Sequence, residues 1–238
     1  ARDLPTQHRS VNAAEVQLID HNRPPLVEQS TPGAWKRALA NRDILLLTIS
    51  YFCTQYVFYL FFSWFFFYLV EVREFGLQQA GIFTSAQWIV GAIAGLAGGV
   101  LTDKMVRRWG LRRGPRWLAV TSLALCGVTL IIGAVSSNIA VVLIMLCLSF
   151  GFTMIADSPY WIAAMAIAGR NAEVATGVLN TGGNVVGAVG GLLVPFIALT
   201  FNWTVAVASG AIFAFIAAAI WCFVCADKPM LSPEGVRE

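Results

Sequence analysis

The chain has 238 residues, of which 58% are hydrophobic and only 12% charged, and its mean hydropathy is +0.70. Polar side chains are too few to cover a water-soluble globule of this length, so the composition excludes a soluble globular protein and indicates an integral membrane protein. The net charge of +3 is small, and its distribution fits a membrane-topology signal better than a nucleic-acid interface.

Residues 1–43 are polar and proline-containing, so we expect a solvent-exposed arm whose residues 34–41 form a short interfacial helix. The chain begins at Ala1 without a methionine or a signal peptide, which favours an internal or excised piece of a longer protein. Six apolar stretches follow, each long enough to cross a hydrocarbon core as a helix of about 20 residues. They cover residues 44–70, 80–101, 117–136, 139–168, 174–200 and 204–225. We therefore predict an all-α membrane protein, with a six-transmembrane-helix bundle over residues 44–225 and a cytoplasmic tail over residues 226–238.

Lysine and arginine are distributed unequally between the two ends of the predicted spans. One end has Arg73 alone, and the other collects eleven basic residues. Basic residues favour the cytoplasmic side of short loops, so both termini are predicted to be cytoplasmic. The eleven are Lys36, Arg37, Arg42, Lys104, Arg107, Arg108, Arg112, Arg113, Arg116, Arg170 and Lys228.

The five cysteines all fall within apolar stretches, where a thiol packs as a small hydrophobic group. Cys222 and Cys225 form a CxxC pair, but inside a span this spacing fits packing better than redox or zinc chemistry. We therefore expect no disulfide, no metal site and no cofactor.

Polar residues divide the six spans into two kinds. The spans at 117–136 and 204–225 are almost wholly apolar and can face lipid all round, whereas the other four carry more polar residues. In the span at 139–168 these are the consecutive residues Asp157, Ser158, Pro159 and Tyr160. The order of polar, polar and apolar spans occurs twice, which predicts two three-helix repeats whose first two helices line a path. In the first span the polar face holds Thr48, Gln55, Tyr56, Tyr59 and Ser63, and in the second Gln87 shares a face with Gly91, Gly95 and Gly98.

The segment GGVLTDKMVRRWGLRRGPR resembles the signature of the major facilitator superfamily, which usually has a further glycine at the position of Val106. The arm, FFSWFFFYLV in the first span and LNTGGNVVGAVGG at 179–191 together resemble the second half of the anion:cation symporter family. The resemblance implies that residues 1–43 link this bundle to an N-terminal six-helix half, in the inner membrane of a bacterium. Its signature residues here are Gly99, Asp103, Lys104, Arg107 and Arg108.

Asp103 lies where the second predicted span ends, beside the basic cluster. It can pair with that cluster or with the N-terminal end of another helix, and such a contact can hold one conformation and release another. The alternative is that the basic residues only anchor the segment in the cytoplasm. Given the resemblance, we expect these five signature residues to form a gating motif.

Asp157 is the only ionisable residue well inside a predicted span, where a carboxylate is costly unless it is protonated, paired or hydrated. It could take up a proton or contact a cation during transport, or it could cap a helix break at Pro159. The neighbouring Tyr160 and Trp161 could be interfacial anchors or part of a cavity wall.

The stretch LNTGGNVVGAVGG places Asn180 and Asn184 about 40° apart on a helix, with Gly183, Gly187 and Gly191 on the same side. The glycines suit close helix packing. Two amides could also serve packing, but each has several hydrogen-bonding groups to satisfy, which favours contact with substrate. The substrate-binding candidates are Gln55, Tyr56, Tyr59, Ser63, Ser158, Asn180 and Asn184.

We therefore predict the C-terminal half of a secondary active transporter that moves a small organic anion, such as a sugar acid or another carboxylate, by alternating access coupled to a proton or a cation. No lysine or arginine lies within a span, so this half has no basic residue there to neutralise a substrate carboxylate. The resemblance implies that the basic site lies in the other half. An enzyme is not expected, because His8 and His21 both lie in the arm and no catalytic set converges. The alternative is a half-length scaffold or self-assembling half transporter.

Overall fold

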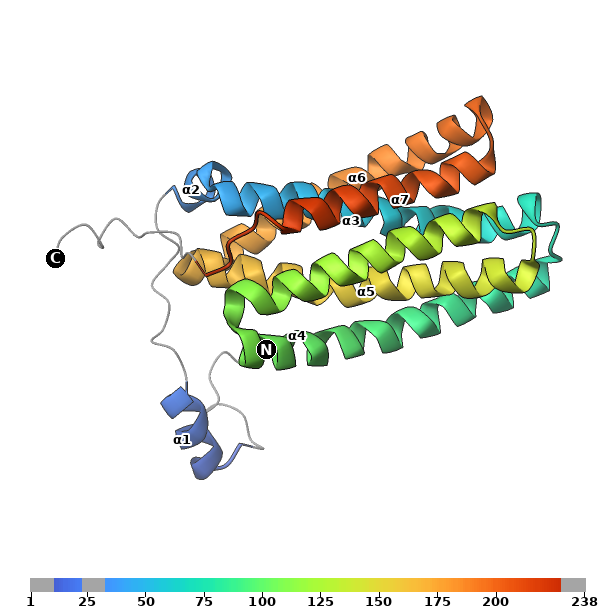
Figure 1. Cartoon of the computed structure of the whole chain (residues 1–238). Coiled ribbons are helices and arrows are strands. Elements are labelled where there is room, and N and C mark those ends of the chain that lie inside the picture. Colours follow the sequence, from blue (N-terminus) through green and yellow to red (C-terminus); the bar gives the residue numbers. More distant parts are fainter. Residues whose placement is uncertain (1–10, 23–32, 228–238) are drawn as a thin grey trace. The chain divides into compact units, whose positions relative to one another are not determined.

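The computed structural model describes residues 11–22 and 33–227 (Figure 1). The chain divides into two compact units, Ala1–Pro32 and Gly33–Glu238. In the first unit, helix α1 covers Ala13–Asn22, and the side-chain oxygen of Asn12 accepts a hydrogen bond from the Glu15 amide at 2.8 Å, which caps its first turn.

The regular secondary structure of the second unit is all helical in its described part. It starts with the short helix α2 (Ala34–Ala40), where a short helix was expected, and continues with α3 (Arg42–Phe67), α4 (Leu77–Val135), α5 (Ile139–Ala168), α6 (Ala172–Thr200) and α7 (Trp203–Trp221). A π-helical turn, η2 (Tyr68–Val72), extends α3, and a 3₁₀ turn, η3 (Gly169–Asn171), joins α5 to α6. Among the described residues, five helical elements are long and apolar enough to cross a membrane.

Helix α4 supplies two of the six predicted spans. Its 59 residues would measure about 88 Å if straight, nearly three times the thickness of a hydrocarbon core. Gly110 interrupts the helix with φ 75° and ψ 172°, a conformation open to glycine because it has no Cβ. The chain doubles back there (Figure 1), giving a first rod over residues 77–109 and a second over 111–135. The fold is therefore the predicted six-helix bundle, although the basic segment expected as a loop is helical on both sides of Gly110.

Asparagine side chains explain where three of the helices begin. The Asn41 side-chain oxygen accepts hydrogen bonds from the amides of Asp43 and Ile44, both at 3.0 Å, at the start of α3. Asn138 and Asn202 cap α5 and α7 in the same way. These caps satisfy amides that have no partner within the helix, so the starts of α5 and α7 fall within one residue of the predicted span starts.

The end of α7 differs from the prediction. The helix ends at Trp221 rather than at residue 225, so Cys222 is its C-cap and Cys225 lies beyond it, outside the helix in which the CxxC pair was expected. The segment after α7 is held by its neighbours. The Cys225 amide donates to the Asp43 carboxylate at 2.9 Å, and Arg116 of α4 donates to the Val224 carbonyl.

The opposite end of the bundle is joined by Arg73, which follows η2. Its Nε donates to the Tyr68 hydroxyl at 2.8 Å, and its Nη2 donates to the carbonyl of Ser136 at 3.3 Å. One side chain therefore links the end of α3 to the turn between α4 and α5.

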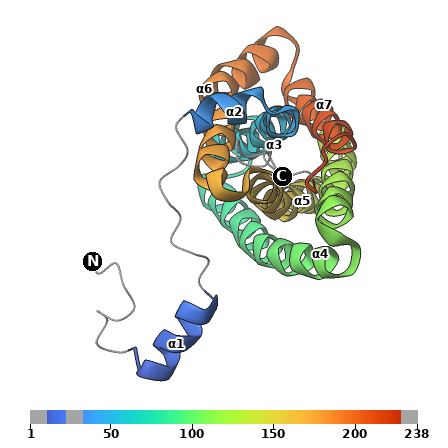
Figure 2. The same cartoon turned by 90° about the vertical axis from the view of Figure 1, so that its left-hand side faces the viewer.

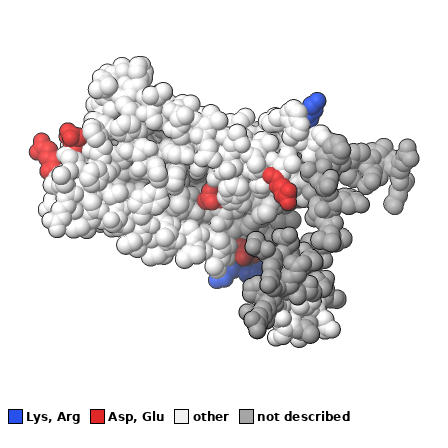
Figure 3. All heavy atoms as spheres, turned by 180° about the vertical axis from the view of Figure 1, so that it is seen from behind, with Lys and Arg blue, Asp and Glu red and all other residues white. Residues whose placement is uncertain are grey.

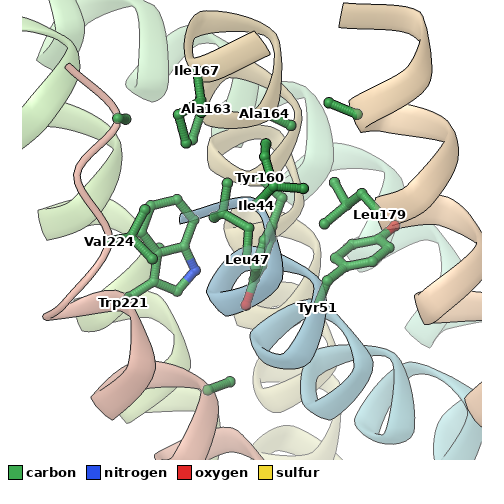
Figure 4. Close-up of a cluster of buried hydrophobic side chains, with 14 of the residues drawn as sticks. Ile44, Leu47, Tyr51, Tyr160, Ala163, Ala164, Ile167, Leu179, Trp221 and Val224 are labelled. Atoms are coloured by element: carbon green, nitrogen blue, oxygen red, sulfur yellow. The ribbon is translucent and has the colours of Figure 1, made fainter. Parts of the chain in front are cut away.

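In the end-on view, α3 and α5 lie toward the middle, and α4, α6 and α7 lie around them (Figure 2). The buried side chains form two clusters along the bundle. Figure 4 shows the one nearer the start of α3, where rings from three helices meet. Its labelled residues are Ile44, Leu47, Tyr51, Tyr160, Ala163, Ala164, Ile167, Leu179, Trp221 and Val224.

Tyr160 is neither an interfacial anchor nor an exposed cavity wall. It is fully buried, and its hydroxyl lies 2.7 Å from the hydroxyls of both Ser50 and Thr54 of α3. Ser50 also donates to the Ala217 carbonyl of α7 at 3.0 Å. This buried network joins α3, α5 and α7 and leaves no hydroxyl in it without a partner.

The two apolar spans are not surrounded by lipid, contrary to expectation. The second rod of α4 buries one face, and α7 buries a face rich in alanine, while large apolar side chains cover the opposite faces. Uncharged side chains make up most of the long face in Figure 3. On α7 the residues toward the bundle are mostly small and the bulky ones mostly face outward, which suits a peripheral membrane helix, whereas the second rod of α4 also buries Leu118, Leu123 and Leu130.

Helix α4 offers a matched test of this packing. A Cβ added to Gly98 would lie 2.8 Å from backbone atoms of Ile155, whereas a Cβ on Gly95 would meet nothing within 4 Å. We expect Gly98→Ala to lower the free energy of unfolding by about 1–3 kcal/mol, because the α5 backbone must move away. Gly95→Ala should be neutral or stabilise by roughly 0.5–1 kcal/mol. Unfolding in mixed detergent micelles measures both, and equal effects would contradict the backbone contact.

Candidate functional site

The glycines of LNTGGNVVGAVGG face α3 and let α6 approach it closely. A Cβ on Gly183 would lie 2.5 Å from the ring of Tyr51, and one on Gly187 would lie 2.6 Å from the ring of Tyr59. Buried or half-buried rings cannot move aside easily, so these positions require glycine. Gly191 differs, because a Cβ there would meet nothing within 4 Å.

Beside this contact, two amides and a phenol form a hydrogen-bonded set that we call the amide–phenol triad: Tyr59 of α3 with Asn180 and Asn184 of α6. The Tyr59 hydroxyl donates to the Asn184 side-chain oxygen at 3.0 Å. The Asn184 side-chain nitrogen donates to the Asn180 backbone oxygen at 2.8 Å and to its side-chain oxygen at 3.1 Å. Both asparagines are exposed, and the side-chain nitrogen of Asn180 donates no hydrogen bond within the part of the chain that the structure describes.

Aromatic rings border the triad. Tyr59 packs edge-on against Phe58 and Phe62, with ring centroids 5.4 and 6.0 Å apart. Trp88 of the first rod of α4 packs against Phe62 at 6.0 Å. Phe62 is 59% exposed and Trp88 is 38% exposed, and Ser63 is exposed beside them. The resulting surface is uncharged, with rings for apolar contact and amides for hydrogen bonding.

Asp157 of α5 lies half-buried among donors from two helices. The Tyr51 hydroxyl of α3 donates to one carboxylate oxygen at 3.2 Å, and the Trp161 indole donates to the other at 2.9 Å. Helix α5 continues through Pro159 to Ala168, so Asp157 does not cap a break there. The carboxylate instead joins α5 to α3, and the space left at Gly183 gives the Tyr51 ring its position.

The remaining substrate-binding candidates lie in different places. Tyr56 is buried, with its hydroxyl 2.9 Å from that of Ser209 and its ring stacked on Phe213 of α7, so it is not on the exposed face where the helical wheel placed it. Gln55 is half-buried beside Gly183. Ser158 is half-buried and faces Gly99 of α4. The structure therefore brings Tyr59, Asn180 and Asn184 together, with Ser63 nearby, and places Tyr56 and Ser158 elsewhere.

Gln87 is a fully buried polar side chain of the first rod of α4. It has no exposed surface, and neither its oxygen nor its nitrogen finds a partner among the described residues. It therefore does not belong to the exposed surface around the triad.

The signature segment lies at the end of the first rod of α4. Asp103, Lys104, Arg107 and Arg108 are all exposed there, and Gly99 lies one turn earlier. Within residues 11–22 and 33–227 the one ion pair joins Arg112 to Asp227 at 3.9 Å, so Asp103 pairs with no described basic residue. Neither predicted partner of Asp103 is engaged in this conformation.

Two residues of the site were not predicted from the sequence. Tyr51 lies about 40° from Gln55 on a helical wheel, so its place on the polar face was visible, but its partner Asp157 is 106 positions away. Trp88 had no such signal, because its role depends on rings of α3 and α5.

Comparisons with known proteins agree with this architecture. A family model described as Major Facilitator Superfamily matches residues 2–111. The probable sulfoacetate transporter SauU of Cupriavidus necator is 32% identical over 193 residues, which cover 79% of this chain and 44% of that protein.

Two further relatives are probable galactarate/D-glucarate transporters. GudP of Bacillus subtilis is 24% identical over 211 residues, covering 81% of this chain and 44% of the relative. GarP of Escherichia coli strain K12 is 26% identical over 212 residues, covering 81% of this chain and 46% of the relative. The chain spans less than half the length of each of these relatives, and all three are named as probable transporters. A helical membrane bundle with these relatives and this signature belongs to the major facilitator superfamily.

Proposed function

We propose that this chain is the C-terminal half of a secondary active transporter for small organic anions, such as sugar acids or other carboxylates. The observation that carries the proposal is the exposed amide–phenol triad, which lies near the middle of two adjacent spans, α3 and α6. The names of the relatives support the substrate class. The triad would bind the uncharged part of the substrate near the membrane midplane, between this bundle and a six-helix partner half.

The hydrogen-bonding capacity of the triad suits a hydroxylated substrate. The Asn180 nitrogen can donate to a substrate oxygen, and the Asn184 oxygen can accept from a substrate hydroxyl in addition to Tyr59. None of the three carries a positive charge, so the anionic end of the substrate would be held by the partner half. Bulky rings such as those of Phe62 and Trp88 would pack against the carbon chain.

Asp157 is the proposed coupling residue, for a proton or another cation. As a carboxylate it accepts a hydrogen bond from Tyr51 of α3, which joins α3 to α5, and another from Trp161 within α5. A proton or cation on this carboxylate would weaken one of these bonds and change the balance between two arrangements of α3 and α5. A movement of Tyr51 on ion binding would also affect the triad, because Tyr51 and Tyr59 both pack against glycines of α6.

The signature segment is the proposed cytoplasmic gate. Asp103 has no described partner, so it is available to a group that approaches in another conformation, such as a helix N-terminus of the partner half. Lys104, Arg107 and Arg108, all exposed, would contribute to the same contact.

The amide–phenol triad gives the test of substrate binding. In the transporter with both halves, Asn180→Ala or Asn184→Ala should weaken glucarate or galactarate binding by about 1–2 kcal/mol, or roughly five- to thirtyfold, because each removes hydrogen bonds to the substrate. Titration calorimetry measures the affinity, and thermal unfolding should change little.

Thr181→Val is the matched control, because Thr181 is exposed beside Asn180 but its hydroxyl already donates to the Gly177 carbonyl at 2.8 Å. It should bind as the wild type does. Normal affinity in both asparagine variants, together with a lowered melting temperature, would assign the amides to packing instead.

Asp157→Asn tests the coupling role. We expect this variant to lose uptake driven by an ion gradient while it still exchanges internal for external substrate, because the amide cannot take up a proton or hold a cation. Proteoliposome uptake and counterflow measure the two activities. Trp161→Phe is the control, since it removes one donor but keeps the carboxyl group, and it should keep driven uptake. Wild-type accumulation and pH profile in Asp157→Asn would leave the carboxylate only the role of holding Tyr51 and Trp161.

Cytoplasmic termini and a bacterial inner membrane complete the proposal. In a cysteine-free background, a cysteine at Arg108 should resist a membrane-impermeant maleimide added outside sealed cells, whereas a cysteine at the exposed Ser137 should react. The reason is that basic segments stay on the cytoplasmic side. Labelling of position 108 from outside would reverse the orientation.

A further inference from the structure

A groove lies at the turn of α4, away from the amide–phenol triad. Its volume is about 370 Å³, and it is formed by both rods. The lining residues follow one another at intervals of four, so each rod contributes one face. They are Met105 and Trp109 from the first rod and Arg113, Trp117 and Thr121 from the second.

The groove owes its shape to two glycines. Gly110 reverses the chain with φ 75°. A Cβ on Gly114 would lie 2.7 Å from backbone atoms of Met105, so the two rods meet backbone to backbone there. Because the rods touch at this point, the two indoles stand apart from the contact and remain open to the surroundings. Trp109 is 46% exposed and Trp117 is 55% exposed.

Arg113 brings a positive charge to the groove, and that charge has no partner among the described residues. Its neighbours are engaged differently: Arg112 pairs with Asp227 at 3.9 Å, and Arg116 donates to the Val224 carbonyl. Lys104 and Arg107 are also exposed without an ion pair, and the only acidic residue of the segment 103–116 is Asp103. The surroundings of the groove are therefore strongly positive.

The rest of the groove is apolar. The Thr121 hydroxyl donates to the Trp117 carbonyl at 2.7 Å, so it offers no unused donor. Exposed tryptophans at the end of a span are typical of the membrane–water interface, where one side meets hydrocarbon and the other meets headgroups. The lining itself holds one guanidinium, that of Arg113, and the guanidinium of Arg108 lies 5.8 Å from the centre of the Trp109 ring. A groove with apolar walls and this positive charge fits a molecule that has an anionic head and a hydrocarbon tail.

We propose that this groove binds an anionic phospholipid. The Arg113 guanidinium holds the headgroup phosphate, and the first methylenes of an acyl chain lie between Trp109 and Trp117. A soluble phosphate would leave both exposed indoles uncovered, which favours the lipid as the source of the phosphate. The site is separate from the proposed substrate surface, since none of its residues belongs to α3 or α6, and Met105 lies 17 residues along α4 from Trp88, or about 26 Å.

Lipid binding can be measured on the whole chain in detergent by native mass spectrometry, with phosphatidylglycerol and phosphatidylcholine of the same acyl chains. The first phosphatidylglycerol should bind about fivefold more tightly than phosphatidylcholine, as expected for one favourable basic contact. Arg113→Gln should remove this preference.

Arg107→Gln is the matched control, because it removes the same charge from a side chain about 200° around the helix from Met105. It should keep the preference. Thermal unfolding confirms that each variant is folded, and Arg113→Lys, which keeps the charge, should retain most of the preference if Arg113→Gln proves unstable.

Three results would overturn the proposal. Equal binding of the two lipids to the wild type would exclude a headgroup site. An equal loss in Arg107→Gln would mean that charge attracts the lipid diffusely. Displacement of the lipid by glycerol phosphate at concentrations similar to that of the lipid would assign the groove to a soluble phosphate. None of these measurements depends on transport.

Discussion

The ring of Tyr51 occupies space that only a glycine at position 183 leaves open, and the arrangement of the site depends on this contact. Because α6 has no side chain there, α3 can approach closely enough for the Tyr51 hydroxyl to reach Asp157 on α5. The carboxylate thus joins α3 to α5, and α6 sets the position of the tyrosine that reaches it. Without hydrophobic attraction between helices in lipid, such close contacts and hydrogen bonds are what hold neighbouring spans together.

The same helix pair repeats this contact one turn further along. Gly187 admits the ring of Tyr59, whose hydroxyl donates to Asn184. A glycine in α6 therefore positions each of the two tyrosines, one serving a carboxylate and the other a pair of amides. If α6 shifts against α3, both hydrogen bonds must change together. If Asp157 binds the coupling ion and the triad binds substrate, as proposed, this shared contact gives a physical reason for coupling between the two sites.

The fold could be predicted largely because hydrocarbon imposes simple rules. The lengths of the apolar stretches identified the spans. The asparagine caps explain why the predicted starts of α5 and α7 were accurate to one residue. The end of α7 was not accurate, since the following residues are apolar but are held by side chains of α3 and α4 rather than by helix. Run length cannot detect such tertiary hydrogen bonds.

The site was predictable only in part, for the same reason. The helical wheel of α6 correctly placed Asn180 beside Asn184, because the angle between two residues of one helix follows from their spacing in the sequence. The wheel of α3 placed Tyr56 with Tyr59, although a difference of about 60° is enough to turn Tyr56 toward Ser209 of α7. Packing between distant segments decides which neighbouring helix a helical face contacts. The sequence of a single span does not show this.

Arg73 gives the uneven distribution of charge a structural meaning. As the one basic residue at its end of the bundle within residues 33–227, it looks like an exception to a statistical tendency. Its guanidinium, however, donates to Tyr68 and to the Ser136 carbonyl and lies 5.4 Å from the Tyr68 ring. That charge is engaged in closing the bundle, whereas Lys104, Arg107 and Arg113 at the other end are left open to the surroundings. Evolution of this chain could therefore exchange any one of those three residues at little structural expense, but not Arg73.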